Sequence, residues 1–387
     1  MPSRKKKLLI VSPTPPPMSG PEIMTRHLLN SSLRDGYELV HYNISKQRDI
    51  ESKGRFDVVN LFFGFIQPFR LAWLLAVHRP AAMYTNLAQN AGGFLRYASF
   101  ILVARVAACP VVTRVMGDGF GHFYRQAKWK WFIHWVVARI DRVIVRAELL
   151  KKQFEGIVPF EKIRVVYSGI EVKEFERDDL KESKDGKLTF LFVGYLTQAK
   201  GAFDLLRSLP QVHREVPELQ FHFMGARMSK ERNITYIDGA ARPQNEVLNE
   251  LMEDDAVKEC ATFVGVLRGE DKIREFVNAD ALVFPSHSEA FPTVVLEAMA
   301  AGLPIISTPV GVLPEAFDET EILFNAPGDV DALATSVIKL AKDGELRKKM
   351  GTTNHARVRG DFTIDRYGNR VRALFDELLG QETSSAP

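Results

Sequence analysis

Short apolar runs rich in valine, isoleucine and phenylalanine recur along this chain and alternate with longer segments of mixed composition. Continuous apolar runs suit strands buried on both faces of a parallel sheet, and the intervening segments are long enough for crossover helices. The pattern therefore predicts an α/β chain built from doubly wound sheets. The expected strands lie at 7–11, 57–63, 82–87, 111–115, 142–145, 163–167, 188–193, 219–224, 261–266, 281–285, 304–307 and 322–324.

Two domains are expected from the 387 residues of the chain. Residues 171–186 are highly charged and contain only two large apolar side chains, so this segment is the natural linker. We expect one Rossmann-like domain over residues 1–176 and a second over 177–387, with the C-terminal helix at about 364–380 able to pack back on the first.

The formal net charge of +3 conceals an asymmetry between the two halves. Residues 1–175 carry 26 Lys/Arg and 13 Asp/Glu, a net +13, whereas residues 176–387 carry a net −10. The basic half is expected to face an anionic partner, which is nucleic acid, phospholipid or a phosphorylated substrate. Two cysteines cannot form a disulfide framework, which favours the cytoplasm. No stretch of 18 apolar residues is present, so the chain is expected to be soluble or peripheral to a membrane.

The most informative segment is PSHSEAFPTVVLEAMAAGLPIISTPVGVLPE, residues 285–315. It follows an expected strand, and Pro292 suits the first turn of a helix, where its missing N–H costs nothing. That helix is expected to run through Met299 and to end before Gly302. The loop before the helix then lies at the carboxyl edge of a parallel sheet, where open α/β folds bind ligands.

Two glutamates occupy this strand–loop–helix unit, Glu289 in the loop and Glu297 eight positions later in the helix. The amides at the helix N-terminus can hold a phosphate with the help of the helix dipole. One carboxylate can then bind sugar hydroxyls near the helix tip and the other a ribose diol. The residues expected to form the phosphate site are Phe291, Pro292, Thr293 and Val294.

These motifs resemble those of the retaining family 4 glycosyltransferases with the GT-B fold, in which two Rossmann-like, doubly wound domains face each other across a cleft. The E-x7-E signature is present as Glu289 and Glu297, followed by matches to LEAMAxGLPI and VGxxPE. FVGYLTQAKG, residues 192–201, resembles FVGRLxxxKG of the family, and YSGIEVKEF, 167–175, resembles its domain junction. The resemblance implies a nucleotide-sugar donor, a UDP-sugar rather than a GDP-sugar, and no metal or other cofactor.

The resemblance also implies individual roles, with Glu289 and Lys200 as the catalytic residues. Lys200 would contact the diphosphate, Glu289 the donor sugar and Glu297 the ribose. Outside the motif, a lysine before a helix is most often a solvated surface residue. Gly194 forms the glycine turn, and Tyr195 stands where most members carry an arginine, which removes one of two cationic diphosphate contacts.

In the first half, residues 12–29 resemble the proline-rich loop of the family, in which Gly20 approaches the donor; otherwise this is a surface loop. In RVMGDGFGHFY, 114–124, Met116 stands where some relatives place a histidine, and Asp118 and His122 are alternatives on the acceptor side. The G-x-G-x-G spacing there lacks the dinucleotide fingerprint, and no helix is expected to open cleanly on it.

Asp329 and Asp331 spell a D-x-D, which binds a divalent ion in transferases of another fold. Because they follow a Pro-Gly at the expected start of a late helix, Asp329 is interpreted as an N-cap.

Three of the four tryptophans lie in KWKWFIHWVVARIDR, residues 128–142. Cations interleaved with amphipathic rings suit an interfacial helix on an anionic bilayer. The alternative is a core helix with Phe132 and Val136 pointing inward. The residues expected to face the membrane are Lys128, Trp129, Lys130, Trp131 and Trp135.

The sequence thus predicts a cytoplasmic glycosyltransferase, peripheral on the inner face of the cell membrane. It would be metal-independent and of hexosyl type, and would act with retention on a lipid-linked, polysaccharide or lipopolysaccharide acceptor. One alternative, motivated by Tyr195 and Met116, is an inactive GT-B scaffold that binds a nucleotide or a partner transferase. Another is a dinucleotide-dependent oxidoreductase, for which the phosphate fingerprint is lacking. A nucleic-acid partner is not expected, because no recognised binding module is present.

Overall fold

The computed structural model describes residues 5–16, 20–45, 58–182, 186–227, 234–237 and 240–380. The chain divides into two compact units. Unit 1 comprises residues 1–169 together with 364–387, and unit 2 comprises residues 170–363.

Unit 1 is built around a sheet of six parallel strands in the order β2-β1-β3-β4-β5-β6. Its strands are β1 (Lys7–Ser12), β2 (Glu38–Asn43), β3 (Ala82–Asn86), β4 (Val111–Arg114), β5 (Arg142–Val145) and β6 (Ile163–Val165). Its helices are α1 (Gly20–Asn30), α2 (Leu33–Gly36), α3 (Val58–His78), α4 (Ala91–Val106), α5 (Phe120–Gln126), α6 (Lys130–Val137) and α15 (Ile364–Leu378).

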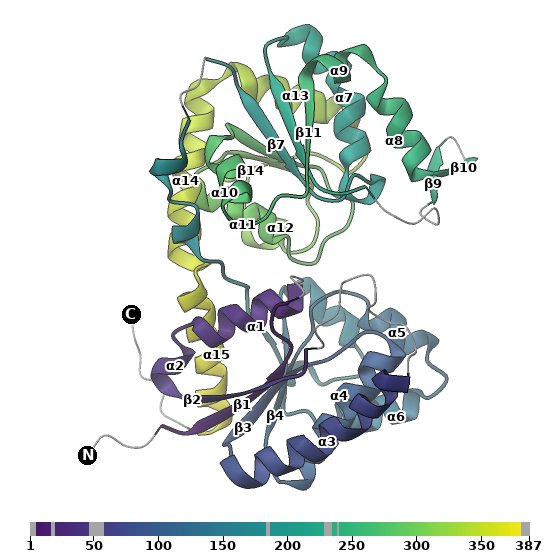
Figure 1. Cartoon of the computed structure of the whole chain (residues 1–387), viewed down its shortest axis with the longest axis vertical. Helices are drawn as coiled ribbons and strands as arrows, with labels where there is room; N and C mark the ends of the chain where they lie inside the picture. The colour runs from purple at the N-terminus through teal and green to yellow at the C-terminus, as the bar shows by residue number, and fades with distance from the viewer. Residues whose placement is uncertain are drawn as a thin grey trace. The chain divides into compact units, whose positions relative to one another are not determined.

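Helices cover both faces of the unit 1 sheet, as in a doubly wound fold. Helix α4 contacts both α3 and α6, and the three form one layer, whereas α1 contacts α2 and α15 in the other (Figure 1). Strands β1, β3 and β4 are almost wholly buried between the layers. This burial explains why the central strands are continuous apolar runs in the sequence.

The C-terminal helix α15 is tied to the sheet of unit 1 by a fully buried arginine. Arg114, at the end of β4, donates a hydrogen bond to the hydroxyl of Tyr367 on α15 and another, of 2.8 Å, to Ser168 Oγ. Tyr367 is itself fully buried, and Tyr37 donates to Asp376 at 2.6 Å. These bonds join the last helix to the first half of the chain.

Unit 2 contains a second six-stranded parallel sheet, in the order β11-β8-β7-β12-β13-β14, and a separate hairpin of β9 and β10. Its strands are β7 (Thr189–Val193), β8 (Gln220–Met224), β9 (Ile234–Ile237), β10 (Ala240–Pro243), β11 (Ala261–Gly265), β12 (Ala281–Phe284), β13 (Ile305–Ser307) and β14 (Ile322–Phe324). Its helices are α7 (Ala202–Glu215), α8 (Gln244–Met252), α9 (Asp255–Cys260), α10 (Gly269–Asn278), α11 (Thr293–Ala300), α12 (Leu313–Ala316), α13 (Val330–Lys342) and α14 (Gly344–Asp361).

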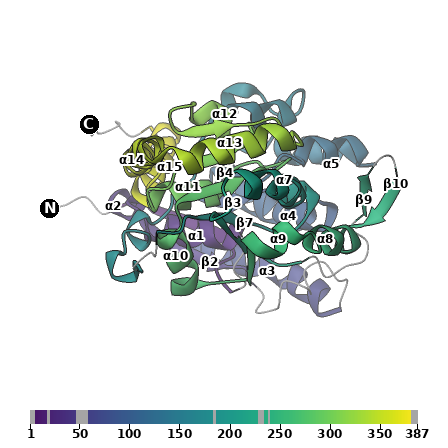
Figure 2. The same cartoon turned by 90° about the horizontal axis from the view of Figure 1, so that it is seen from above.

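The main core of unit 2 lies between β7, β8 and the helix group α7, α9 and α13. Helix α7 contacts both α9 and α13 (Figure 2). Four buried phenylalanines of β7 and β8 pack in pairs, Phe190 against Phe221 and Phe192 against Phe223. This core fixes the carboxyl ends of β7 and β12, from which the loops of the candidate site leave.

The strand expected at 57–63 is wrong, because the backbone from Val58 onward is helix α3; Asp57 lies outside the described residues. An apolar run of this length fits a buried strand or a buried helix equally well, and its continuation to His78 decides for the helix. The sheet instead takes its edge strand from β2, whose mixed composition gave no strand signal.

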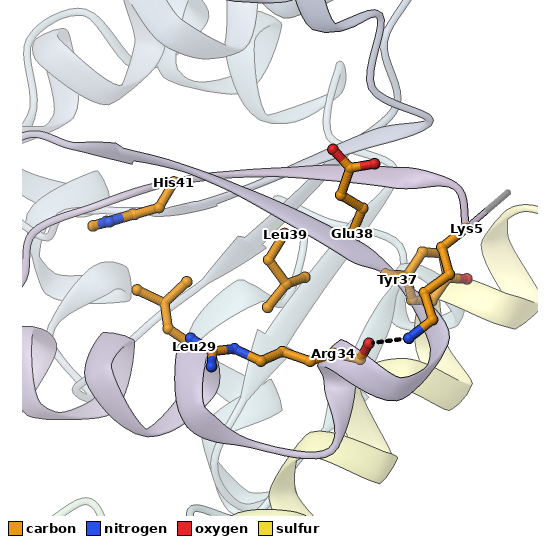
Figure 3. Close-up of a pocket in the computed structure, with 7 residues that line it drawn as sticks. All are labelled: Lys5, Leu29, Arg34, Tyr37, Glu38, Leu39 and His41. Carbon is orange, nitrogen blue, oxygen red and sulfur yellow. Dashed lines mark hydrogen bonds between the residues drawn. The ribbon is translucent and has the colours of Figure 1, made fainter.

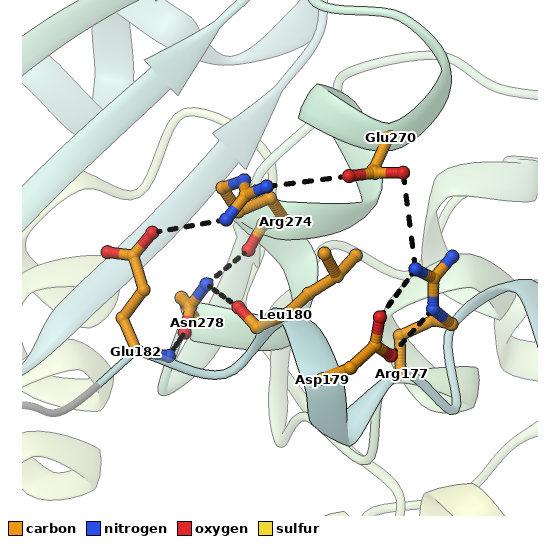
Figure 4. Close-up of polar contacts among 7 residues, drawn as sticks. All are labelled: Arg177, Asp179, Leu180, Glu182, Glu270, Arg274 and Asn278. Atoms are coloured by element: carbon orange, nitrogen blue, oxygen red, sulfur yellow. Dashed lines mark hydrogen bonds and ion pairs between the residues drawn. The ribbon is translucent and has the colours of Figure 1, made fainter.

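The segment expected to be a linker is part of unit 2. Phe175 and Leu180 are buried, and the Phe175 ring packs edge-on against Phe276 of α10 at 5.4 Å between centroids. Ion pairs and hydrogen bonds join this segment to α10 (Figure 4): Arg177 contacts Asp179 and Glu270, Arg274 contacts Glu182, and Asn278 donates to the carbonyl of Leu180. The boundary therefore lies at 169/170 rather than 176/177.

Candidate active site

Two loops of unit 2 meet at the carboxyl edge of its sheet, because β7 and β12 are neighbouring parallel strands. The first loop follows β7 and ends in a 3-10 turn, Gln198–Lys200, before α7 begins. Gly201, at φ 75°, joins this turn to α7 in a left-handed conformation that favours glycine. A Cβ atom at Gly201 would overlap the carbonyl oxygen of Pro285 in the second loop. Glycine at this position therefore lets the two loops touch.

Backbone and side-chain hydrogen bonds lock the second loop, 285–292, in place. The amide of His287 and the hydroxyl of Ser286 both donate to the carbonyl of Ala199, at 3.0 and 3.1 Å. On its other side, Gly311 has a φ of 59°, and a Cβ there would overlap the carbonyl of Glu289. The loop is therefore packed between the segment around Gly201 and the segment around Gly311. Such packing holds its side chains in place before a ligand binds.

This packing brings Lys200 and Glu289 together. The ammonium of Lys200 forms an ion pair with Glu289 Oε1, and both side chains are partly buried. The two residues are 89 positions apart in sequence, so only the pairing of β7 with β12 joins them. The pair offers one cation and one carboxylate at a single point of the sheet edge.

Helix α11 begins next to this pair. Pro292 precedes the helix as its N-cap residue rather than lying in its first turn, and no side chain caps the helix. Phe291 and Pro292 are buried, while Thr293 and Val294 are half-buried. The helix ends at Ala300, and Gly302 follows at a φ of 73°. The start of α11 therefore has backbone amides that no side chain caps.

Glu297 is the fifth residue of α11. Its carboxylate pairs with a lysine that the sequence motifs do not identify. Lys272 Nζ, from α10, lies 2.7 Å from Glu297 Oε1, and both side chains are mostly buried, with exposed fractions of 29% and 17%. Each glutamate of the E-x7-E pair is thus matched with one ammonium group. Lys272 is identified only by this ion pair in the folded structure.

Asp204 and His287 form a further pair that sequence reasoning missed. His287 Nε2 lies 2.5 Å from Oδ2 of the buried Asp204, in the first turn of α7. Because Gly201 and Ser286 are near neighbours of this pair, the contact fixes the two loops against each other. Gly194 lies at the end of β7, close to Lys200, and the adjacent Tyr195 is half exposed.

In unit 1, Gly20 is the first residue of α1 and not part of a loop as expected. A Cβ at Gly20 would lie 3.9 Å from Cε of Met116, so the ends of β1 and β4 bring these two residues together. Asp118 and His122 are both exposed on the following segment. A seven-residue helix, α5, does open on this glycine-rich segment, contrary to expectation, because Gly119 serves as its N-cap.

The tryptophan segment 128–142 contains both of the environments that the sequence left open. Trp129 is half-buried and packs against Phe94 and Phe123. By contrast, Trp131 is 74% exposed and Trp135 is 42% exposed. Lys128 and Lys130 are exposed as well.

Residues 172–357, nearly all of unit 2, match the family model described as glycosyl transferases group 1. The matched segment is a little less than half of the chain. Both glutamates and both lysines described above lie within it.

Alignments with similar proteins cover slightly more of the chain than the match to the family model does. An uncharacterized glycosyltransferase of Methanocaldococcus jannaschii is 29% identical over 54% of this chain and 52% of its own length. The gpi3 subunit of a phosphatidylinositol N-acetylglucosaminyltransferase from Schizosaccharomyces pombe is 26% identical over 57% of this chain and 44% of its own. The chain thus spans about half the length of the curated relatives it matches.

The whole chain has the fold of solved GT-B glycosyltransferases, two Rossmann-like α/β units. HepE from Anabaena, crystallised in complex with UDP, superposes with a TM-score of 0.70 at 15% identity, covering 96% of this chain and 100% of HepE. The segment that matches the group 1 model lies in unit 2.

Other candidate features lie outside the group 1 motifs. Asp329 accepts a 2.9 Å hydrogen bond from the amide of Ala332 at the start of α13, which confirms the N-cap interpretation of the D-x-D. Among the described residues, no group of three or more His, Cys, Asp or Glu side chains could hold a metal ion. In the same part of the chain, no helix is long and apolar enough to cross a membrane.

An open hollow of about 740 Å³ lies beside edge strand β2 in unit 1 (Figure 3). Lys5, Leu29, Arg34, Tyr37, Glu38, Leu39 and His41 line it. In the close-up, the Lys5 ammonium donates to the carbonyl of Arg34 at 2.8 Å and so closes one end. None of the motif residues lines this hollow.

Proposed function

We propose that this protein transfers a hexose from a nucleotide sugar, a UDP-sugar, to a lipid-linked or polysaccharide acceptor with retention of anomeric configuration. The observation that carries the proposal is the pairing of Lys200 with Glu289 beside the N-terminus of α11. A cation and free helix-terminal amides suit a diphosphate, and a carboxylate at the same point suits sugar hydroxyls.

In the proposed donor complex, the diphosphate lies on Lys200 and on the amides of Thr293 and Val294. Glu297 binds the ribose diol, and Glu289, released from Lys200, binds the donor sugar. As the glycosidic bond breaks, negative charge grows on the departing UDP, and Lys200 with the α11 dipole stabilises it. The acceptor hydroxyl attacks from the face that UDP leaves and passes its proton to the departing diphosphate. The bond from the anomeric carbon to the acceptor oxygen forms on the same face as the bond to UDP that breaks, which retains configuration.

Tyr195 replaces an arginine in this scheme, so the stabilisation of the leaving group falls on Lys200 and the helix amides. These groups supply the positive charge that a divalent cation supplies elsewhere, and we propose that the reaction needs no metal. We propose that unit 1 binds the acceptor, with Asp118 and His122 on that side, and that Gly20 approaches the donor. The structure of HepE in complex with UDP supports the proposal of a UDP-sugar donor. The name of the phosphatidylinositol N-acetylglucosaminyltransferase subunit supports the proposal of a lipid acceptor.

The test is release of the nucleoside diphosphate, UDP or GDP, from a panel of UDP-sugars and GDP-sugars, with and without membrane extract as acceptor. We expect UDP release from at least one UDP-sugar, and a loss of about 100-fold or more in Glu289→Ala and Lys200→Ala, because each removes a transition-state contact. A wild-type protein that binds UDP without any turnover would instead identify the inactive scaffold.

A further inference from the structure

Exposed apolar side chains of the described residues concentrate on one layer of unit 1. Of twelve large hydrophobic side chains that are exposed, ten lie on α3, α4, α6 or the segment 148–160. The other two, Tyr195 and Val266, belong to unit 2. Eight of the ten lie on α3, α4 and α6, and α4 contacts both α3 and α6, so these three helices form one layer, the α3–α4–α6 layer (Figure 1).

Helix α3 carries the most regular part of this surface. Ile66, Phe69, Trp73 and Val77 are spaced by three or four residues and lie along one outward face, with Phe69 66% and Trp73 61% exposed. The opposite face of the same helix is also apolar and buried in the unit 1 core, through Leu71 and Leu75. A helix that is apolar on both faces requires a second apolar environment outside the sheet.

The charge around the helices of this layer is mainly positive. Residues 58–140 contain nine Lys/Arg and a single acidic residue, Asp118; of the nine, Arg114 is fully buried and Arg105 is paired with Asp141. The guanidinium of Arg139 stacks on the exposed Trp135 ring at 3.7 Å, and Arg70 lies on the exposed side of α3. Cations interleaved with tryptophan and phenylalanine match an anionic headgroup layer. A second copy of the chain would oppose the same cations to one another, so the charge disfavours self-association.

We propose that the outer face of the α3–α4–α6 layer docks on an anionic lipid bilayer, with the α3 stripe of Ile66, Phe69, Trp73 and Val77 inserting among the headgroups together with Trp131. This proposal rests on the proposed function only in placing the acceptor at a membrane. The sequence predicted a membrane contact only for residues 128–142, which include α6; the proposed surface adds α3 and α4. Gly20 and Met116 lie at the carboxyl edge of the sheet and not on this layer, so docking leaves them accessible.

The experiment is co-sedimentation of the full chain with two kinds of vesicle. One contains phosphatidylcholine alone, and the other also contains about one third phosphatidylglycerol, which makes its surface anionic. We expect wild-type protein to bind the anionic vesicles and to dissociate at high salt. The double variant F69Q/W73Q should bind about 30-fold more weakly, because two largely exposed aromatic rings lose their apolar contact. Val266→Gln, an equally exposed apolar side chain in unit 2, is the matched control and should bind as wild type.

Thermal unfolding of F69Q/W73Q should match wild type, because both side chains are largely solvent-exposed. Binding of F69Q/W73Q within twofold of wild type would overturn the proposal, as would wild-type binding that is equal on neutral vesicles and insensitive to salt. A concentration-dependent dimer that F69Q/W73Q dissociates would also overturn it, in favour of a second copy. UDP release from the donor, measured without vesicles, tests the proposed function separately and should be unchanged in F69Q/W73Q.

Discussion

The ammonium of Lys272 on α10 lies 2.7 Å from the carboxylate of Glu297 on α11, in a part-buried ion pair that no motif of the sequence announces. The pair joins two helices of unit 2 next to the start of α11. If Glu297 holds the ribose, Lys272 orients that carboxylate and keeps it from turning toward solvent. In that case Lys272 is a positioning residue for the nucleotide.

Lys272→Met should weaken UDP binding by about tenfold, roughly 1.4 kcal/mol, because Glu297 loses its partner in a part-buried environment. Lys272→Arg should recover most of the affinity by restoring the ion pair. The measurement is titration calorimetry with UDP, and kcat should change less than KM. Equal affinity in wild type and Lys272→Met would show that Glu297 does not need this lysine.

Gly201→Ala should destabilise unit 2 by about 3 kcal/mol or more, because the new Cβ meets the Pro285 carbonyl and the backbone is left-handed. Gly186 provides a matched control, since its φ of 77° is similar but no atom lies within 4 Å of a Cβ there. Gly186→Ala should cost only about 1 kcal/mol for the backbone conformation. Urea unfolding measures both, and equal losses would show that the contact with Pro285 is not tight.

Burial lowers the pKa of His27 on α1 to about 4, although its Nδ1 donates a 3.1 Å hydrogen bond to the carbonyl of Gly169. In the unfolded chain the pKa is about 6.5, so the unfolded state binds the proton first. The free energy of unfolding of unit 1 should therefore fall as the pH drops from about 6.5 to 4, by roughly 1–3 kcal/mol in total. His27→Asn should lack this part of the pH dependence in urea titrations at pH 7 and 5. The same loss in both proteins would assign it to other groups.

Asp204→Ala should loosen the two loops of the site by removing the carboxylate that His287 contacts. We expect a loss of about 1–2 kcal/mol in stability and a raised KM for the UDP-sugar. Asp204→Asn should restore much of both, because its amide oxygen still accepts from His287 Nε2. If the KM for the UDP-sugar is unchanged in Asp204→Ala, the contact between Asp204 and His287 does not contribute to donor binding.

The sequence predicted features that are local and missed those that depend on packing. The unit from β12 to α11 is a short, continuous stretch, so Glu289 and Glu297 could be placed on a loop and a helix from the preceding strand, Pro292 and Gly302. Lys272 is 25 residues before Glu297, and only the docking of α10 beside α11 brings the two together. Asp204 and His287 are likewise joined only across neighbouring strands.

Ambiguous patterns account for the remaining differences. The run at 57–63 fits a strand or a helix, and the structure uses α3. The charged segment 171–186 looks like a linker, yet its two apolar side chains anchor it to unit 2. An aromatic cluster does not reveal which rings face the core, so Trp129 and Trp131 could not be separated without the contacts of Trp129 with Phe94.

The central claim is that Lys200 holds the diphosphate of a nucleotide sugar. Titration calorimetry of UDP and of uridine into wild type and Lys200→Met tests it most directly, because uridine lacks the diphosphate. We predict that wild type binds UDP, that Lys200→Met weakens UDP by about tenfold or more, and that uridine binding changes by less than about twofold. Failure of the wild type to bind UDP, or equal UDP affinity in Lys200→Met, would contradict the account.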